Sequence, residues 1–209
     1  MLFTKEEWQT QLVERCGGEV ASKLQKAHVA VAGLGGLGSN IAIFLTRMGI
    51  GSLHLIDSDR VDFSNLHRQQ YFVEQIGEYK TEALASTLQK INPYVNLQLS
   101  CERVTEENLP KLFTDADIIC EAFDNPQAKA MLVNGVVEHF PGKVIVAASG
   151  MAGLGEGNLV KARKLNKRLY ICGDGVSDCE SASLYAARVA LCGAQQAHLV
   201  LRIILGLEG

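Results

Sequence analysis

The chain has 209 residues, of which 47% are hydrophobic, enough to bury one substantial core, and no linker or low-complexity run divides it. Its 20 basic and 23 acidic residues give a net charge of −3, which argues against nucleic acid or an anionic membrane as a partner. The charged N-terminal segment does not fit a secretion signal, and no run of about 18 apolar residues could span a bilayer. We therefore expect a single cytoplasmic domain over residues 1–209.

The first predicted elements are helices within residues 4–26, and a regular alternation of strands and helices follows. Short apolar runs predict the strands, and apolar residues three and four positions apart predict the helices. The predicted strands cover residues 29–32, 53–57, 96–101, 118–122 and 144–148. The predicted helices between them cover residues 39–48, 80–91, 108–112 and 127–138. This alternation favours an α/β fold with a Rossmann-like, doubly wound sheet that is parallel in its first half.

The pattern changes after residue 150. Residues 157–174, GNLVKARKLNKRLYICGD, predict two strands about a polar turn. We expect these strands to be antiparallel additions at the sheet edge. Residues 181–207 predict a long final helix.

A glycine-rich turn, GLGGLG, joins the first predicted strand to the next helix and fits the G-x-G-x-x-G pattern with Gly33, Gly35 and Gly38. Glycines permit a tight turn, a close approach of backbone N–H groups to phosphate, and close packing of helix on strand. Asp57 closes the second predicted strand, at the position where such folds hydrogen-bond a ribose hydroxyl. These residues indicate an adenosine ribose and a phosphate, and they do not distinguish NAD from ATP.

Residues further along the chain favour a triphosphate. Arg68 offers a rigid fork of donors and Lys80 a mobile point charge, which suit more negative charge than a dinucleotide carries. Asp124 follows the fourth predicted strand, and a triphosphate would repel it unless Mg²⁺ lay between them. The structural alternatives are an ordinary solvated pair for the two cations and a helix N-cap for Asp124.

With these residues in place, the sequence resembles the ThiF/MoeB/HesA family, whose members are relatives of ubiquitin-activating enzymes. The resemblance rests on GLGGLG, the D-x-D of residues 57–59, S-N-L-x-R-Q at residues 64–69, a lysine after a glycine, and D-N at residues 124–125. It covers residues 29 to about 157, and S-N-L-x-R-Q is its most distinctive part. The short length and the segment GEGNLV are similar to small bacterial ThiF-like proteins.

The resemblance implies an enzyme that uses ATP and Mg²⁺ to adenylate the C-terminal Gly-Gly carboxylate of a ubiquitin-like sulfur carrier, with release of pyrophosphate. A ThiS-like carrier in thiamine thiazole synthesis is the expected partner. This carboxylate is already ionised at neutral pH, so the enzyme needs no general base and supplies position and positive charge instead.

The resemblance also assigns the site residues. It implies catalytic roles for Arg68, Lys80 and Asp124, with Asp124 as the Mg²⁺ ligand. The residues expected to bind the nucleotide are Gly33, Gly35, Gly36, Gly38, Asp57, Asp59, Ser64, Asn65, Leu66, His67, Arg68, Gln69, Lys80, Asp124 and Asn125.

Three features depart from the family pattern. Many relatives hold zinc with two CxxC pairs, and this sequence has none, so no zinc is expected. An N-terminal R-Y-x-R-Q element, whose arginine reaches the ATP of a neighbouring subunit, is replaced by LVERCGGEV. Arg15 is the best substitute, which favours a homodimer, and a surface arginine is the alternative. Cys172 and Cys179 lie in the region where some relatives have a crossover-loop cysteine that links covalently to the carrier.

Other functions remain open from the sequence. A NAD-dependent oxidoreductase explains the glycine-rich turn and Asp57 but leaves Arg68, Lys80 and Asp124 without a task. A non-catalytic nucleotide-binding scaffold is kept open by the missing zinc pairs and by the uncertain role of Arg15. A tRNA-modifying relative that adenylates a small carboxylate is disfavoured by the negative net charge.

Overall fold

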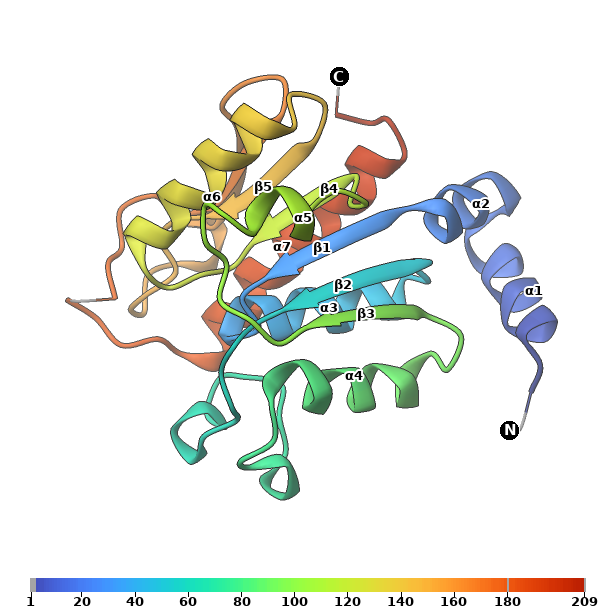
Figure 1. The fold of residues 1–209 in the computed structure, drawn as a ribbon, viewed down its shortest axis with the longest axis horizontal. Coiled ribbons are helices and arrows are strands. Elements are labelled where there is room, and N and C mark those ends of the chain that lie inside the picture. Colours follow the sequence, from blue (N-terminus) through green and yellow to red (C-terminus); the bar gives the residue numbers. More distant parts are fainter. Residues whose placement is uncertain (1–2, 180, 209) are drawn as a thin grey trace.

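The structure is a computed structural model that describes residues 3–179 and 181–208. At its centre lies a seven-stranded sheet with the strand order β3-β2-β1-β4-β5-β7-β6 (Figure 1). The strands are β1 (His28–Ala32), β2 (Ser52–Ile56), β3 (Asn96–Ser100), β4 (Ile118–Glu121), β5 (Val144–Ala148), β6 (Lys161–Lys164) and β7 (Leu169–Gly173). Every neighbouring pair in this sheet is parallel except β6 and β7. The predicted doubly wound fold is confirmed.

Helices cover both faces of the sheet. They are α1 (Lys5–Cys16), α2 (Gly18–Lys26), α3 (Gly36–Arg47), α4 (Lys80–Ile91), α5 (Leu109–Leu112), α6 (Pro126–His139) and α7 (Ala186–Ile204), with short 3-10 turns η1 (Phe63–Asn65), η2 (Val73–Gln75) and η3 (Gly157–Leu159). Apolar side chains of α3, α4 and α7 form one core against the sheet, and those of α5 and α6 form a second core on the other face. None of the described helices is both long enough and apolar enough to cross a bilayer.

The antiparallel strands predicted after residue 150 are confirmed as the pair of β6 and β7 at the sheet edge. Within the sheet, β7 pairs in parallel with β5, so the reversal of direction occurs between β7 and β6. The short turn between β6 and β7 makes those two strands a hairpin. The long connection after β5 carries the chain past the position of β7 to the edge first, so the hairpin returns β7 in the direction of β5.

The final helix is shorter than predicted, because it begins only at Ala186 and ends at Ile204. Tyr185 precedes it in an extended conformation, with φ −105° and ψ 135°. The preceding segment instead forms a separate turn in which the N–H of Ala182 donates to the carbonyl of Asp178 over 3.0 Å. Helix α3 differs in the opposite way, since it starts at Gly36 and the glycine-rich turn runs directly into it.

Gly38 allows α3 to pack tightly against the glycine-rich turn. A Cβ atom at this position would lie 1.8 Å from the carbonyl oxygen of Gly33, far inside van der Waals contact. We expect Gly38→Ala to force the turn away from the helix and to lower the free energy of unfolding by about 1–3 kcal/mol, the usual cost of overpacking a core. Urea unfolding followed by circular dichroism measures this difference.

The matched control is Gly18→Ala in α2, where the nearest atom to an added Cβ is a Val13 methyl carbon at 4.0 Å. This change should leave stability unaltered or slightly improved, because alanine favours helix over glycine. Equal unfolding midpoints for the two variants would contradict the packing role of Gly38.

Candidate functional site

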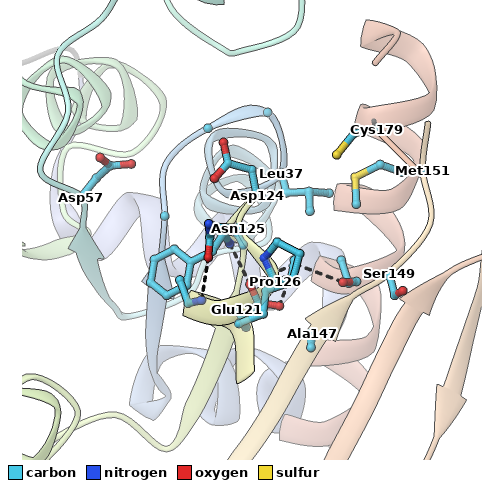
Figure 2. Close-up of a pocket in the computed structure, with 18 of the residues that line it drawn as sticks. Leu37, Asp57, Glu121, Asp124, Asn125, Pro126, Ala147, Ser149, Met151 and Cys179 are labelled. Carbon is cyan, nitrogen blue, oxygen red and sulfur yellow. Dashed lines mark hydrogen bonds and ion pairs between the residues drawn. The ribbon is translucent and has the colours of Figure 1, made fainter. Parts of the chain in front are cut away.

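A cavity of about 780 Å³ opens at the carboxyl ends of the parallel strands, where β1 and β4 lie side by side. The chain leaves these two strands toward opposite faces of the sheet, so the loops that follow them separate and form a crevice. The cavity walls come from the glycine-rich turn, the segments after β2 and β4, and the loops after β5 and β7. In Figure 2, Asp57 lies on one side of the cavity, Met151 and Cys179 lie on the other, and Asp124 lies between them.

The carboxylate of Asp57 holds the glycine-rich turn in place. The N–H of Leu34 donates to Asp57 Oδ2 over 2.6 Å, and the N–H of Asp59 donates to Oδ1 over 2.8 Å. Burial raises the pKa of Asp57, and the Lys80 ammonium opposes that shift. Helix α3 begins at Gly36, on the cavity wall, and no side chain of the described residues caps this terminus. Its free N–H groups and partial positive charge suit a phosphate.

Arg68 and Lys80, the two cations expected to bind a triphosphate, both line this cavity. Lys80 is only 6% exposed, and its Nζ donates to Asp59 Oδ2 over 2.8 Å. Arg68 is half-buried, and its Nη1 lies 3.4 Å from the carbonyl oxygen of Ser64. Within residues 3–179 and 181–208 it forms no ion pair. Lys80 is therefore no solvated surface cation, and the charge of Arg68 is left unbalanced beside the glycine-rich turn.

Asp124 and Asn125 follow β4 and both line the cavity. Asn125 is the N-cap of α6, and its side chain accepts a hydrogen bond from the N–H of Ala128 over 2.9 Å. The capping role considered for Asp124 thus belongs to Asn125. Asp124 is exposed, and its carboxylate forms no ion pair with another residue that the structure describes. One carboxylate beside a phosphate site fits Mg²⁺, which often binds one or two carboxylates together with substrate phosphates.

The cavity brings together ten of the residues expected to bind nucleotide: Gly33, Gly35, Gly36, Asp57, Asp59, Arg68, Gln69, Lys80, Asp124 and Asn125. The other five, Gly38, Ser64, Asn65, Leu66 and His67, are not part of its lining. Asn65 Oδ1 accepts from the N–H of Asp62 over 3.0 Å, and Asp62 Oδ1 accepts from the N–H of Ser64 over 2.8 Å. The S-N-L-H stretch therefore forms the turn that carries Arg68 to the cavity wall.

Arg15 lies far from this cavity. It occupies the last turn of α1, is exposed, and belongs to the part of the molecule near the amino ends of the strands (Figure 1). The cavity lies at the carboxyl ends of the same strands. Arg15 can therefore contact a nucleotide only in a second copy of the chain.

An ion pair with a buried carboxylate, not predicted from the sequence, lies in the cavity wall. Glu121 ends β4 with a side chain only 1% exposed, and Lys129 Nζ donates to its two carboxylate oxygens over 3.0 and 2.9 Å. The same ammonium donates to the carbonyl of Ala148 over 3.1 Å, so it ties together the ends of β4, α6 and β5. Burial raises the pKa of Glu121, and Lys129 opposes that shift. A carboxylate inside the apolar run DIICEAF was the available signal, because such groups are rarely buried unpaired.

The two cysteines expected near a crossover loop have different environments. Cys172 lies inside β7 and is fully buried, and its carbonyl accepts from Cys192 Sγ at 3.7 Å. Burial raises the pKa of Cys172 and of Cys192 to about 12, so both remain unreactive thiols at neutral pH. Cys172 is therefore no candidate for a covalent link, whereas Cys179 is exposed and lines the cavity beside Met151 (Figure 2). In the described part of the chain, no three His, Cys, Asp or Glu side chains are grouped as metal ligands.

Thiol burial gives a direct test of the fold. Under native, mildly alkaline conditions, iodoacetamide should alkylate Cys101 and Cys179, which are exposed, and leave Cys120, Cys172 and Cys192 unmodified, because their thiolates form only at much higher pH. Peptide mass spectrometry identifies the modified positions. The same reaction in denaturant serves as the control and should label all of them. Rapid native labelling of Cys172 would contradict its position in β7.

The sequence matches the ThiF family over residues 8–209. It is 32% identical over 204 residues to the adenylyltransferase and sulfurtransferase UBA4 of Candida glabrata, which covers 93% of this chain and 46% of that protein. It is 33% identical over 162 residues to the sulfur carrier protein adenylyltransferase of Thermus thermophilus, which covers 70% of this chain and 60% of the relative. The chain thus spans about half the length of these relatives.

Solved structures show the same fold. The tRNA N6-threonylcarbamoyladenosine dehydratase TcdA of E. coli, in complex with AMP, superposes with a TM-score of 0.87 over 99% of both chains, at 19% sequence identity. The same enzyme in complex with ATP superposes equally well. The family match over nearly the whole chain confirms the resemblance inferred from GLGGLG and S-N-L-x-R-Q, and the chain belongs to the ThiF family.

Proposed function

We propose that this chain is an ATP-dependent adenylyltransferase that activates the C-terminal Gly-Gly carboxylate of a ubiquitin-like sulfur carrier. The observation that carries the proposal is the charge arrangement of the cavity. Arg68 has no ion-pair partner among the described residues, the N-terminus of α3 is uncapped, and the Asp124 carboxylate is exposed in the same cavity. Two anion-binding groups and one free carboxylate suit a magnesium-bound triphosphate better than a dinucleotide.

The relatives support this assignment by name. UBA4 is described as an adenylyltransferase and sulfurtransferase, and the Thermus thermophilus protein as a sulfur carrier protein adenylyltransferase. Both are longer than this chain. The UBA4 match covers 93% of this chain, and we assign adenylation to this shared part.

The proposed reaction forms one bond and breaks one. An oxygen of the carrier's terminal carboxylate attacks the α-phosphorus of ATP, the bond to the bridging oxygen of the β-phosphate breaks, and pyrophosphate leaves with that electron pair. The carboxylate is already ionised at neutral pH, so no proton has to be removed. The N–H groups of α3 and the guanidinium of Arg68 stabilise the charge that develops on the phosphates. Mg²⁺ bound at Asp124 would neutralise part of the triphosphate charge.

We assign the two substrates to opposite walls of the cavity. Asp57 and the glycine-rich turn form the side suited to the ribose and phosphates of ATP. The opposite side is formed by the loops after β5 and β7, with Met151 and Cys179 (Figure 2). We assign the carrier tail to that side, because the opposite side is the one suited to the nucleotide.

The finer assignment is a ThiS-like carrier in thiamine thiazole synthesis, with residues 1–209 acting as one cytoplasmic adenylation domain in a homodimer. Arg15 supports the dimer, since it is exposed at the end of the sheet opposite its own cavity. In this arrangement the α1 helix of one copy reaches the triphosphate of the other. In each mixed dimer of an Arg15→Ala chain with an Arg68→Ala chain, one of the two sites would then be intact and active, whereas dimers of either variant alone would have no intact site.

ATP–pyrophosphate exchange tests the proposal. Radiolabelled pyrophosphate should enter ATP only when a ThiS-like carrier ending in Gly-Gly is present, and a carrier lacking its terminal glycines is the matched control. ATP binding without exchange for any carrier would instead establish a nucleotide-binding scaffold. Saturable binding of NAD in preference to ATP would overturn the proposal in favour of an oxidoreductase.

A further inference from the structure

A second ion pair, buried on both sides, lies behind the cavity wall opposite Asp57. Asp174 Oδ2 and Arg188 Nη2 are 2.6 Å apart, and their side chains are 5% and 7% exposed. Asp174 follows β7 and Arg188 lies in the first turn of α7. Arg188 Nη1 also donates to the carbonyl oxygens of Gly155 and Glu156 in the loop after β5.

Asp174 ties the loop after β7 to the same point. Its Oδ1 accepts hydrogen bonds from the N–H groups of Val176 over 2.9 Å and Ser177 over 2.8 Å. Burial alone would raise the pKa of Asp174, but these N–H donors and Arg188 outweigh it and lower the pKa to about 2. The carboxylate is therefore charged under all physiological conditions. Ser177 Oγ in turn accepts from the N–H of Ala152 over 3.0 Å, which joins the two loops directly.

The segments held in this way form one wall of the cavity. Met151 and Ala152 in the first loop, Ser177 in the second and Val189 on α7 all line it. Val189 packs so closely over the glycine-rich turn that a Cβ atom on Gly36 would lie 2.8 Å from its Cγ1. Asp174 and Arg188 are not part of the lining themselves. They hold in position the loop and helix residues that do line the cavity.

Stability alone does not account for the pair. Removing two charges from water carries a large free-energy penalty, and apolar residues of similar volume often stabilise a core as well as or better than a buried ion pair. Arg188 Nε is also buried without a hydrogen-bond partner among the described residues, which adds to the cost. What the pair supplies beyond apolar packing is direction, because a guanidinium fork fixes the geometry of every group that it contacts.

We propose that Asp174 and Arg188 are positioning residues that hold the loops after β5 and β7 as the wall against which the acceptor carboxylate is placed for attack on ATP. This inference rests on the proposed adenylation. It separates the cavity into a nucleotide side, organised by Asp57, and an acceptor side, organised by the ion pair. Altering the pair should therefore affect the acceptor far more than ATP.

The test uses Arg188→Lys, which keeps the charge and loses the fork, and Asp174→Asn, which keeps the shape and loses the charge. Each variant should raise the KM for a ThiS-like carrier ending in Gly-Gly about tenfold or more, because small displacements of a reacting group cost that much or more. The KM for ATP should stay within about twofold, because the glycine-rich turn is held by Asp57 and is not displaced when the ion pair is altered. Arg202→Lys is the matched control, since Arg202 pairs with Glu208 at the other end of α7.

Hydrogen–deuterium exchange supplies a readout that needs no activity. In the two variants, amides of residues 150–157 and 174–178 should exchange faster than in the unaltered protein, while those of β1 and α3 should not change. A proportional rise of both KM values, or unaltered carrier KM, would overturn the inference. If the unaltered protein supports no exchange with any carrier, the proposed adenylation fails. Hydrogen exchange then decides the anchoring role alone, and unchanged protection of both loops would overturn it.

Discussion

Arg68→Ala is expected to lower kcat for carrier-dependent ATP–pyrophosphate exchange by about a hundredfold or more, the usual loss when one preorganised donor to developing charge is removed. The guanidinium lines the cavity beside the glycine-rich turn and has no carboxylate partner among the residues that the structure describes. Its charge is therefore not neutralised by a neighbouring carboxylate and is available to the phosphates. Steady-state exchange rates at saturating ATP and carrier give the effect on kcat.

Two further variants make this result specific. Arg47→Ala removes an exposed arginine from the opposite end of α3 and should leave the exchange rate unchanged. Arg68→Lys keeps the charge but loses the planar fork, so it should restore only part of the activity. Near-normal turnover of Arg68→Ala would remove this residue from the reaction and would leave the N-terminus of α3 and Lys80 as the remaining phosphate-binding candidates.

Asp124→Asn should lower the same rate by a comparable factor, about a hundredfold, and should raise the Mg²⁺ concentration needed for half-maximal activity. The carboxylate is exposed in the cavity, and the capping of α6 depends on Asn125 instead, so the substitution changes charge without removing a structural contact. Titration of exchange activity with Mg²⁺ at fixed ATP separates the loss of a metal ligand from a loss of folded protein.

Asp115→Asn is the control for this experiment, because Asp115 precedes β4 on the exposed surface, whereas Asp124 follows the same strand. It should leave both the rate and the Mg²⁺ dependence unchanged. An Asp124→Asn enzyme whose Mg²⁺ requirement equals that of the unaltered protein would show that the metal is held by other groups.

The nucleotide side of the cavity could be predicted because its residues follow the ends of predicted strands. Asp57 comes directly after one strand, Asp124 comes shortly after another, and the glycine-rich turn comes after a third. In a parallel sheet the carboxyl ends of the strands lie at one edge, so residues that follow different strands are close together in space. The positions of Ser64 and Asn65 could not be predicted in this way, because the polar groups of a turn can bond within the turn, as they do here.

The acceptor side was not predictable in this way. Asp174 and Arg188 belong to a loop and to a helix whose packing no short-range pattern describes, and Glu121 finds Lys129 only because α6 lies along β4. Strand direction was equally hidden. The alternation of β7 marks it as a strand, but a period of two residues is the same for a parallel and an antiparallel partner.

The sequence by itself determined the doubly wound sheet, the glycine-rich turn, the family and the cations that line the cavity with that turn, because each depends on local spacing or on the order of elements along the chain. Only the tertiary structure decided that Asn125 rather than Asp124 caps α6, that Cys172 is buried, and that Arg15 lies at the opposite end of the sheet. It also decided that one ion pair anchors two loops to α7. The physical reason is that burial and ion pairing depend on which segments pack together, and that packing is a property of the whole chain.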